Sequence, residues 1–343
     1  MKRVTIDDIA QAAGVSKGAV SYALNGRPGV SEPTRRRILE IAERLGWAPS
    51  SAARALSDGR AGALGLVLNR PPRVLGVEPY FMQLIAGIES VLATEGSESG
   101  ALLLKVVDGV EAELACYRRW WAERRVDGVI LMNLRMDDPR IDLVGELGLP
   151  AVLLGGPERT GGLPCVWSDD GAAIEEVVEY LFSLGHRRIA RVAGPEEFVH
   201  TGTRTAAFER TARRLGLRDT RTVHTDYSDE AGARAARRLL ASGAPPTALV
   251  FDNDLMAAAA LGVAAELGRA VPAQVSLVAW DDSALCRLVR PPLTAVRRPI
   301  AEHGAAAVRL LLDLLAGGEP RDVETAAPIL VPRGTTGRCG AVG

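Results

Sequence analysis

The strongest constraint on the fold is an alternation of short apolar runs with longer amphipathic stretches, which begins at Ala63 and fills most of the chain. The strand-like runs are Leu64–Leu68, Leu102–Val107, Val129–Met132, Ala151–Leu154, Ile189–Ala193, Ala248–Phe251 and Val275–Trp280. The helix-like stretches are Phe81–Thr94, Glu111–Glu123, Ile141–Leu147, Ala172–Leu184, Thr205–Leu215, Glu230–Ala241 and Leu255–Leu267. This alternation predicts parallel sheets with crossover helices. Because Gly155-Gly156-Pro157 interrupts it, we expect two α/β lobes with a ligand cleft at the strand ends.

The bulk properties of the 343 residues indicate a globular protein of two or three domains. Apolar residues make up 47% and charged residues 24%, and no apolar run is long enough to span a bilayer. Asp7 and Asp8 follow Lys2 and Arg3 where a signal peptide would be apolar, so we expect a cytoplasmic protein with no membrane partner. The four cysteines lack metal-site spacing, and we expect no metal and no cofactor.

The first sixty residues have a different pattern from the rest of the chain. Thr5 provides a helix cap before apolar residues at helical spacing, and Gly14-Val15-Ser16 provides a turn and a second cap. A second helix is expected over about Lys17 to Leu24, and a third carries Ile38, Ile41 and Leu45 and ends at Gly46. Residues 1–60 carry a net charge of +4 and the remainder −5. Three short helices on a basic segment predict a helix-turn-helix that binds DNA.

These residues resemble the headpiece of the lactose-repressor (LacI/GalR) family. The shared pattern is Val4-Thr5-Ile6-x-Asp8-Ile9-Ala10-x-x-Ala13-Gly14-Val15-Ser16-x-x-x-Val20-Ser21-x-x-Leu24-Asn25, followed by Val30-Ser31-x-x-Thr34-Arg35. The resemblance implies that phosphate-positioning contacts come from Thr5, Ser16, Ser21, Asn25, Ser31 and Thr34. It implies base reading by Lys17, Gly18 and Tyr22. Most relatives have Arg at the position of Tyr22, so we expect an unusual operator at that step.

The segment from Trp47 to Arg60 begins at a helix break and ends in polar residues. A helix of one or two turns there is too short to be stable alone, and a plain linker is the alternative interpretation. In the family the matching segment folds on the operator. The resemblance therefore implies that Ala53 and Leu56 contact DNA, with Leu56 wedged between base pairs in the minor groove.

The body resembles the periplasmic-binding-protein-like core of the same family, in which the chain crosses between two lobes three times. The matching segments include Arg125-Val126-Asp127-Gly128-Val129-Ile130, Leu184-Gly185-His186-Arg187-Arg188-Ile189-Ala190 and Asn253-Asp254-Leu255-Met256-Ala257. We expect a headpiece over residues 1–46, a hinge and linker over 47–61 and a core over 62–340. Within the core, one lobe is expected at about 62–164 and 297–316, and the other at about 165–296 and 317–340.

The resemblance also implies a set of effector-binding residues. They are Pro79, Tyr80, Met82, Trp167, Arg204, Tyr227, Asn253, Trp280, Asp281 and Arg298. Sugar-binding relatives usually carry Asp where this chain has Gly155, and many carry a neutral residue where it has Arg298. Both differences make the cleft less acidic. A ligand with an acid group is therefore one hypothesis beside the neutral sugar that the family favours.

The sequence thus predicts a ligand-responsive DNA-binding regulator, specifically a repressor that a sugar-like molecule releases from a near-palindromic operator. A corepressor or activator of the same family is an alternative, because the sequence does not say which state the ligand prefers. A solute-binding protein shares the fold of the body but leaves Met1 to Arg60 unexplained. An enzyme is excluded by the lack of a nucleophile, phosphate-loop or metal motif. We expect a homodimer, since one headpiece covers a half-site and the tail has no heptads.

Overall fold

The computed structural model describes residues 4–47, 60–70, 78–95, 100–217 and 219–340. The chain forms two compact units, residues 1–61 and residues 62–343. The predicted contacts of Ala53 and Leu56 with DNA lie outside the described residues. Among the described residues, no helix is both long and apolar enough to cross a membrane.

The first unit is a bundle of three helices, α1 (Ile6–Ala13), α2 (Lys17–Leu24) and α3 (Glu32–Arg44). Its core contains Ile9, Val20 and Ile38, all fully buried. Gly14 ends α1 in the left-handed conformation, with φ of 65°, which allows the sharp turn into α2. Leu45 was expected on the apolar face but is 36% exposed, because α3 ends one residue earlier.

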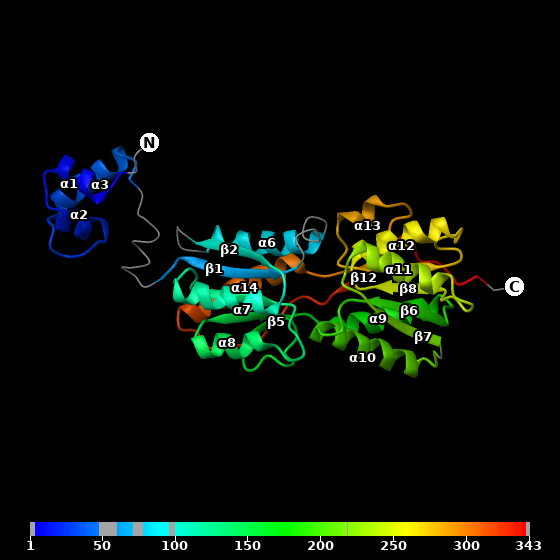
Figure 1. Cartoon of the computed structure of the whole chain (residues 1–343). Helices are drawn as coiled ribbons and strands as arrows, with labels where there is room; N and C mark the ends of the chain where they lie inside the picture. The colour runs from blue at the N-terminus through cyan, green and yellow to red at the C-terminus, as the bar shows by residue number, and fades with distance from the viewer. Residues whose placement is uncertain (1–3, 48–59, 71–77, 96–99, 218, 341–343) are drawn as a thin grey trace. The chain divides into compact units, whose positions relative to one another are not determined.

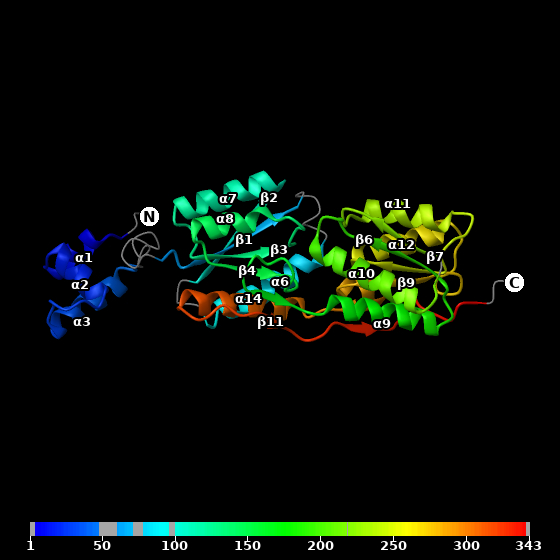
Figure 2. The ribbon, with the colours of Figure 1, turned by 90° about the horizontal axis from the view of Figure 1, so that it is seen from below.

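The first lobe of the second unit is a parallel sheet in the order β11-β5-β4-β3-β1-β2. Its strands are β1 (Ala63–Asn69), β2 (Ala101–Val107), β3 (Gly128–Met132), β4 (Ala151–Leu154), β5 (Cys165–Trp167) and β11 (Val323–Glu324). Helices α6 (Pro79–Leu92) and α14 (Ile300–Leu315) pack on one face. Helices α7 (Val110–Ala122) and α8 (Pro139–Leu147) pack on the other, as Figure 2 shows.

The second lobe is a sheet in the order β12-β10-β9-β8-β6-β7, in which only β12 runs antiparallel to its neighbour among the described strands. Its strands are β6 (Arg188–Ala193), β7 (Asp219–His224), β8 (Ala248–Phe251), β9 (Ser276–Trp280), β10 (Thr294–Arg297) and β12 (Ile329–Val331). Helices α9 (Asp170–Ser183) and α10 (Val199–Arg214) cover one face. Helices α11 (Asp229–Leu240), α12 (Asp254–Glu266) and α13 (Ala284–Leu288) cover the other.

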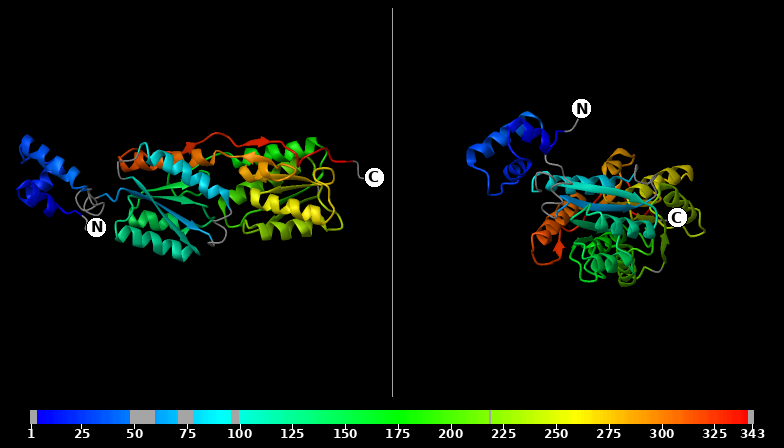
Figure 3. Two further views of the ribbon diagram at one scale, coloured as in Figure 1. Left: turned by 90° about the horizontal axis from the view of Figure 1, so that it is seen from above. Right: turned by 60° about the vertical axis from the view of Figure 1, so that its left-hand side comes forward.

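The chain crosses between the lobes three times, after β5, after β10 and after β11 (Figure 3). Two predicted lobe limits are wrong in detail. Residues 165–167 form β5 and residues 323–324 form β11, and both strands pair within the first sheet rather than the second. These strands are too short to leave an apolar run in the sequence. Helix α10 also begins at Val199 rather than Thr205. The apolar spacing did not reveal its first turns, because the residues that they bury include the polar Thr201 and Arg204.

Candidate functional site

The three predicted base readers all lie on the outer surface of α2. Lys17 and Gly18 are exposed in its first turn, and Tyr22 is 44% exposed one turn later. Lys17 pairs with Asp7 at 2.8 Å, an exposed pair that a phosphate or base can displace at little cost. The ring of Tyr22 lies against Gly29, where an added Cβ would approach it to 3.1 Å. This contact holds a flat aromatic edge at the surface of α2.

The predicted phosphate-positioning residues cluster at helix ends. Thr5 and Ser16 cap α1 and α2, and their side-chain oxygens accept hydrogen bonds from backbone amides of those helices. Ser31 precedes α3 and pairs with Thr34 at 2.9 Å, while Asn25 ends α2 and donates to Ser21 at 3.4 Å. Helix N-termini favour anions because their free amides point outward. The structure thus places Thr5, Ser16 and Ser31 at helix N-termini, and the side chains of Thr5 and Ser16 cap their helices.

A cavity of about 290 Å³ lies between the two lobes of the second unit. Its polar lining follows the carboxyl ends of parallel strands: Asn133 after β3, Ser168 after β5, Asn253 after β8, Asp281 after β9 and Arg298 after β10. This is where open α/β sheets bind ligands. The lobes also pair beside the cavity, where the amide of Val199 donates to the Leu134 carbonyl and the amide of Met136 donates to that of Glu197, both at 2.9 Å.

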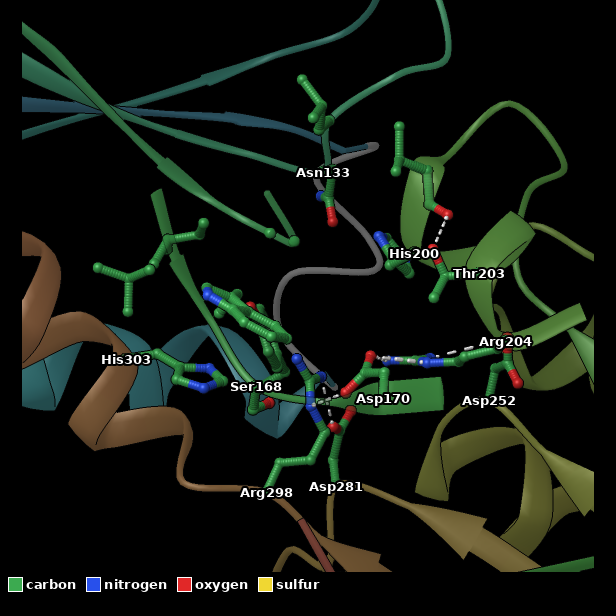
Figure 4. A pocket seen from close by; sticks show the side chains of 18 of the residues that line it. Asn133, Ser168, Asp170, His200, Thr203, Arg204, Asp252, Asp281, Arg298 and His303 are labelled. Atoms are coloured by element: carbon green, nitrogen blue, oxygen red, sulfur yellow. Dashed lines mark hydrogen bonds and ion pairs between the residues drawn. The ribbon is translucent and has the colours of Figure 1, made fainter. Parts of the chain in front are cut away.

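The floor of the cavity is a chain of buried ion pairs (Figure 4). Arg204 donates to Asp170 at 2.6 Å and lies 3.7 Å from Asp252. Arg298 contacts Asp281 at 3.1 Å and Asp170 at 3.4 Å. Asp170 therefore joins the two arginines.

Burial and charge set the ionisation of these groups. Burial acts to raise the pKa of Asp170, but the charges of Arg204 and Arg298 outweigh it and hold that pKa well below its usual range. Burial raises the pKa of Asp281, and the charges of the two arginines only partly offset this. Burial raises the pKa of Glu78 to about 7 and lowers the pKa of His200 to about 3. The histidine is neutral at pH 7 and can offer the cavity a hydrogen bond without charge.

Several buried polar atoms in this cavity have no hydrogen-bond partner among the described residues. They are Arg70 Nε, Glu78 Oε2, Ser168 Oγ, Asp170 Oδ1 and Arg298 Nε. Buried polar groups in native proteins are nearly always satisfied, and each exception costs about 1–3 kcal/mol. Their convergence on one cavity indicates a site for a molecule rich in hydrogen-bonding groups.

Comparisons with known proteins agree on one family. Residues 5–50 match the family described as bacterial regulatory proteins, lacI family, and residues 178–336 match a periplasmic binding protein-like domain. The HTH-type transcriptional regulator CelR of Thermobifida fusca is 32% identical over 335 residues, which cover 96% of this chain and 95% of that protein. The chain belongs to the lacI family of transcriptional regulators. Its relatives are regulators and not enzymes.

Solved structures of lacI-family proteins extend the match to nearly the whole chain. The lac repressor dimer bound to operator and the anti-inducer ONPF has a TM-score of 0.85 and 27% identity, covering 98% of this chain and 100% of that one. A CelR–cellobiose complex has a TM-score of 0.73 and 28% identity, covering 97% of this chain and 100% of that one. The two-lobed fold with its helical headpiece is therefore that of the family.

Seven of the ten predicted effector-binding residues of this lacI-family regulator line the cavity. They are Tyr80, Trp167, Arg204, Tyr227, Asn253, Asp281 and Arg298. The other three, Pro79, Met82 and Trp280, are not among its lining residues. Met82 is 58% exposed, because it lies on the outer side of α6. Trp280 is fully buried beneath Arg204, whose guanidinium carbon lies 4.4 Å from the ring centre, so it supports a cavity residue.

Several other residues that line the cavity were not predicted from the sequence. They are Arg70, Glu78, Asn133, Ser168, Asp170, His200, Thr203, Asp252 and His303, among others. Asp252 directly precedes Asn253 at the end of β8, and its position at a strand end was a usable signal. Asp170 follows β5, which is too short to recognise in the sequence. Arg70 and Glu78 lie between the predicted strand Leu64–Leu68 and the predicted helix Phe81–Thr94, where the sequence shows no periodic signal.

Proposed function

We propose that this regulator is a dimeric repressor that leaves its operator when a neutral saccharide fills the cavity between the lobes. The observation that carries the proposal is the pairing of charge in the cavity. Among the described lining residues there are six carboxylates and three guanidiniums, and each guanidinium faces a carboxylate at 3.9 Å or less. An acidic ligand would meet an excess of negative charge, whereas hydroxyl groups can both donate and accept.

The apolar part of the lining fits the same ligand class. The side chains of Tyr80, Trp167 and Tyr227 lie among the charged groups. Aromatic faces suit the apolar C–H surface of a sugar ring, and polar groups placed around it fix its orientation. The cellobiose bound to the related CelR is a ligand of this class. This support favours the neutral sugar over the acid that Gly155 and Arg298 suggested from the sequence alone.

A thermal-shift screen tests the ligand class. The full-length protein is heated with neutral saccharides, sugar acids and nucleosides, because a ligand of the folded cleft raises the melting temperature. At one hundred times Kd the stabilisation is about 2.7 kcal/mol, which corresponds to a rise of about 4–5 °C for a protein of this size. A rise with sugar acids and none with neutral saccharides would overturn the proposal.

The direction of regulation needs a second measurement. Fluorescence anisotropy of a labelled operator is followed as the saccharide is added, and we expect the anisotropy to fall as the protein dissociates. Tighter binding would instead show corepressor logic, since a ligand stabilises whichever state it binds better. Light scattering tests the assembly, and a stable tetramer or a monomer on the operator would contradict the dimer.

A further inference from the structure

Arg70 and Glu78 form a pair of charged residues at one end of the cavity. Arg70 follows β1, and Glu78 immediately precedes α6. Both residues line the cavity and both are more than nine-tenths buried, at 9% and 8% exposure. Arg70 Nε and Glu78 Oε2 lie 3.9 Å apart, too far for a hydrogen bond. Neither atom has any other hydrogen-bond partner among the described residues.

The guanidinium of Arg70 is held in place by aromatic rings from both lobes. Its central carbon lies 5.9 Å from the ring centre of Phe81, 5.4 Å from that of Phe198 and 5.5 Å from that of Tyr227. One of its terminal nitrogens donates to the Asn69 carbonyl at 3.3 Å. These contacts fix the group without using its Nε–H. The Arg70 guanidinium is therefore held in place, while Arg70 Nε and Glu78 Oε2 have no hydrogen-bond partner among the described residues.

The two atoms are too far apart for a direct hydrogen bond, but a single oxygen beside them can bond to both. Charge-assisted hydrogen bonds are about 2.8 Å long from a guanidinium and about 2.6 Å long from a hydroxyl to a carboxylate. For an oxygen at those distances, the angle at the oxygen between Arg70 Nε and Glu78 Oε2 is about 90°, which a hydroxyl oxygen tolerates. A hydroxyl can accept from the first atom and donate to the second. When Glu78 is ionised, above its pKa of about 7, a ligand carboxylate would satisfy Arg70 but face the Glu78 carboxylate, and an ammonium would face Arg70.

We propose that Arg70 and Glu78 bind one hydroxyl of the saccharide, which accepts a hydrogen bond from Arg70 Nε and donates one to Glu78 Oε2. The assignment rests on the proposed function of the cavity as a saccharide site. It makes the pair a specificity-determining subsite that recognises a hydroxyl at one ring position. Because Arg70 also contacts rings of both lobes, the subsite holds the sugar where the lobes meet.

The test measures the affinity of single-hydroxyl deletions by calorimetry at pH 8, above the pKa of Glu78. The probes are D-glucose, D-galactose, cellobiose and maltose, each with its monodeoxy derivatives. We expect one deoxy position to weaken binding to the wild type by about tenfold to a hundredfold, the effect of a hydrogen bond to charged groups. In Arg70→Met/Glu78→Met the parent sugar should bind more weakly, and the same deoxy derivative should bind as well as its parent.

Two further variants separate recognition from structure. Glu78→Gln keeps the shape of the side chain and should reduce the deoxy penalty to about tenfold or less. Arg214→Met/Glu179→Met removes an exposed pair between α9 and α10 that lies outside the cavity, and it should keep the full penalty. If saccharides bind but no deoxy position loses its penalty in the Arg70 and Glu78 variants, the subsite is refuted and the saccharide site stands. If no saccharide binds the wild type, both proposals fail.

Discussion

Asp170 is the residue on which the charge balance of the cavity depends most. Its carboxylate receives two hydrogen bonds from Arg204, at 2.6 and 2.9 Å, and lies 3.4 Å from Arg298. The Asp170 side chain is 10% exposed and that of Arg204 only 2%. Breaking a buried ion pair by neutralising one partner costs about 3–5 kcal/mol when the other charge is left buried without compensation. Here Arg204 keeps Asp252 nearby and Arg298 keeps Asp281. We therefore expect Asp170→Asn to lower the free energy of unfolding by about 3 kcal/mol, the lower end of that range.

Asp169 offers a matched control next to it in the chain. Its carboxylate is exposed and caps α9, accepting from the Ala172 amide at 2.8 Å. Because Asn caps helices as well as Asp does, Asp169→Asn should change the unfolding free energy by less than about 0.5 kcal/mol. Denaturant titration followed by tryptophan fluorescence reports on the core, since four of the five tryptophans lie after residue 62. If Asp170→Asn and Asp169→Asn unfold at the same midpoint, the charge-balance reasoning is refuted.

Four other substitutions test the structure. Glu78 has a pKa of about 7 in the folded protein against 4.5 for the free side chain, so the folded state holds a proton that the unfolded state has lost between these pH values. The free energy of unfolding should therefore fall as pH rises from 4.5 to 7. In Glu78→Gln, denaturation midpoints measured over this range should depend less on pH. Gly202 in α10 has no atom within 4 Å of an added Cβ, so Gly202→Ala should stabilise by about 0.5–1 kcal/mol. Gly87→Ala in α6 should destabilise, because its Cβ would overlap the Ala301 carbonyl oxygen at 1.9 Å, and equal melting temperatures for these two variants would contradict the packing. Tyr22→Arg should change which operator is selected from a randomised pool more than the affinity for nonspecific DNA.

The sequence was sufficient where one strong periodic signal decided the structure. The limits of α1 and α2 and the central strands of both sheets were predictable, because their apolar spacing and caps agree. The resemblance supplied the strand-end positions of Asn253 and Asp281, and both line the cavity. It also placed Met82 and Trp280 in the effector site, but neither residue lines the cavity. A shift of one residue along a helix or strand changes the side that a side chain faces.

The rest of the site depends on distances that no spacing rule encodes. Arg70 and Glu78 lie outside any periodic run of the sequence, and their 3.9 Å separation depends on how the end of β1 and the start of α6 are placed. Asp170 acts through arginines at positions 204 and 298, on elements far apart in the chain. Each lining guanidinium faces a carboxylate in this way, and carboxylates outnumber guanidiniums in the described lining. The hypothesis of an acidic ligand counted the carboxylate lost at Gly155 and the guanidinium gained at Arg298, and these pairs were not visible to it.

The three crossings between the lobes have a consequence for synthesis on the ribosome. The first lobe needs α14 and β11, and the second needs β12, which pairs with β10. Beyond it, the amide of Cys339 donates to the Leu184 carbonyl at 2.8 Å. Translation proceeds at about 5–20 residues per second, so the headpiece emerges on the order of tens of seconds before either lobe can be completed. Each new molecule thus acquires its DNA-binding helices well before the part that senses the effector.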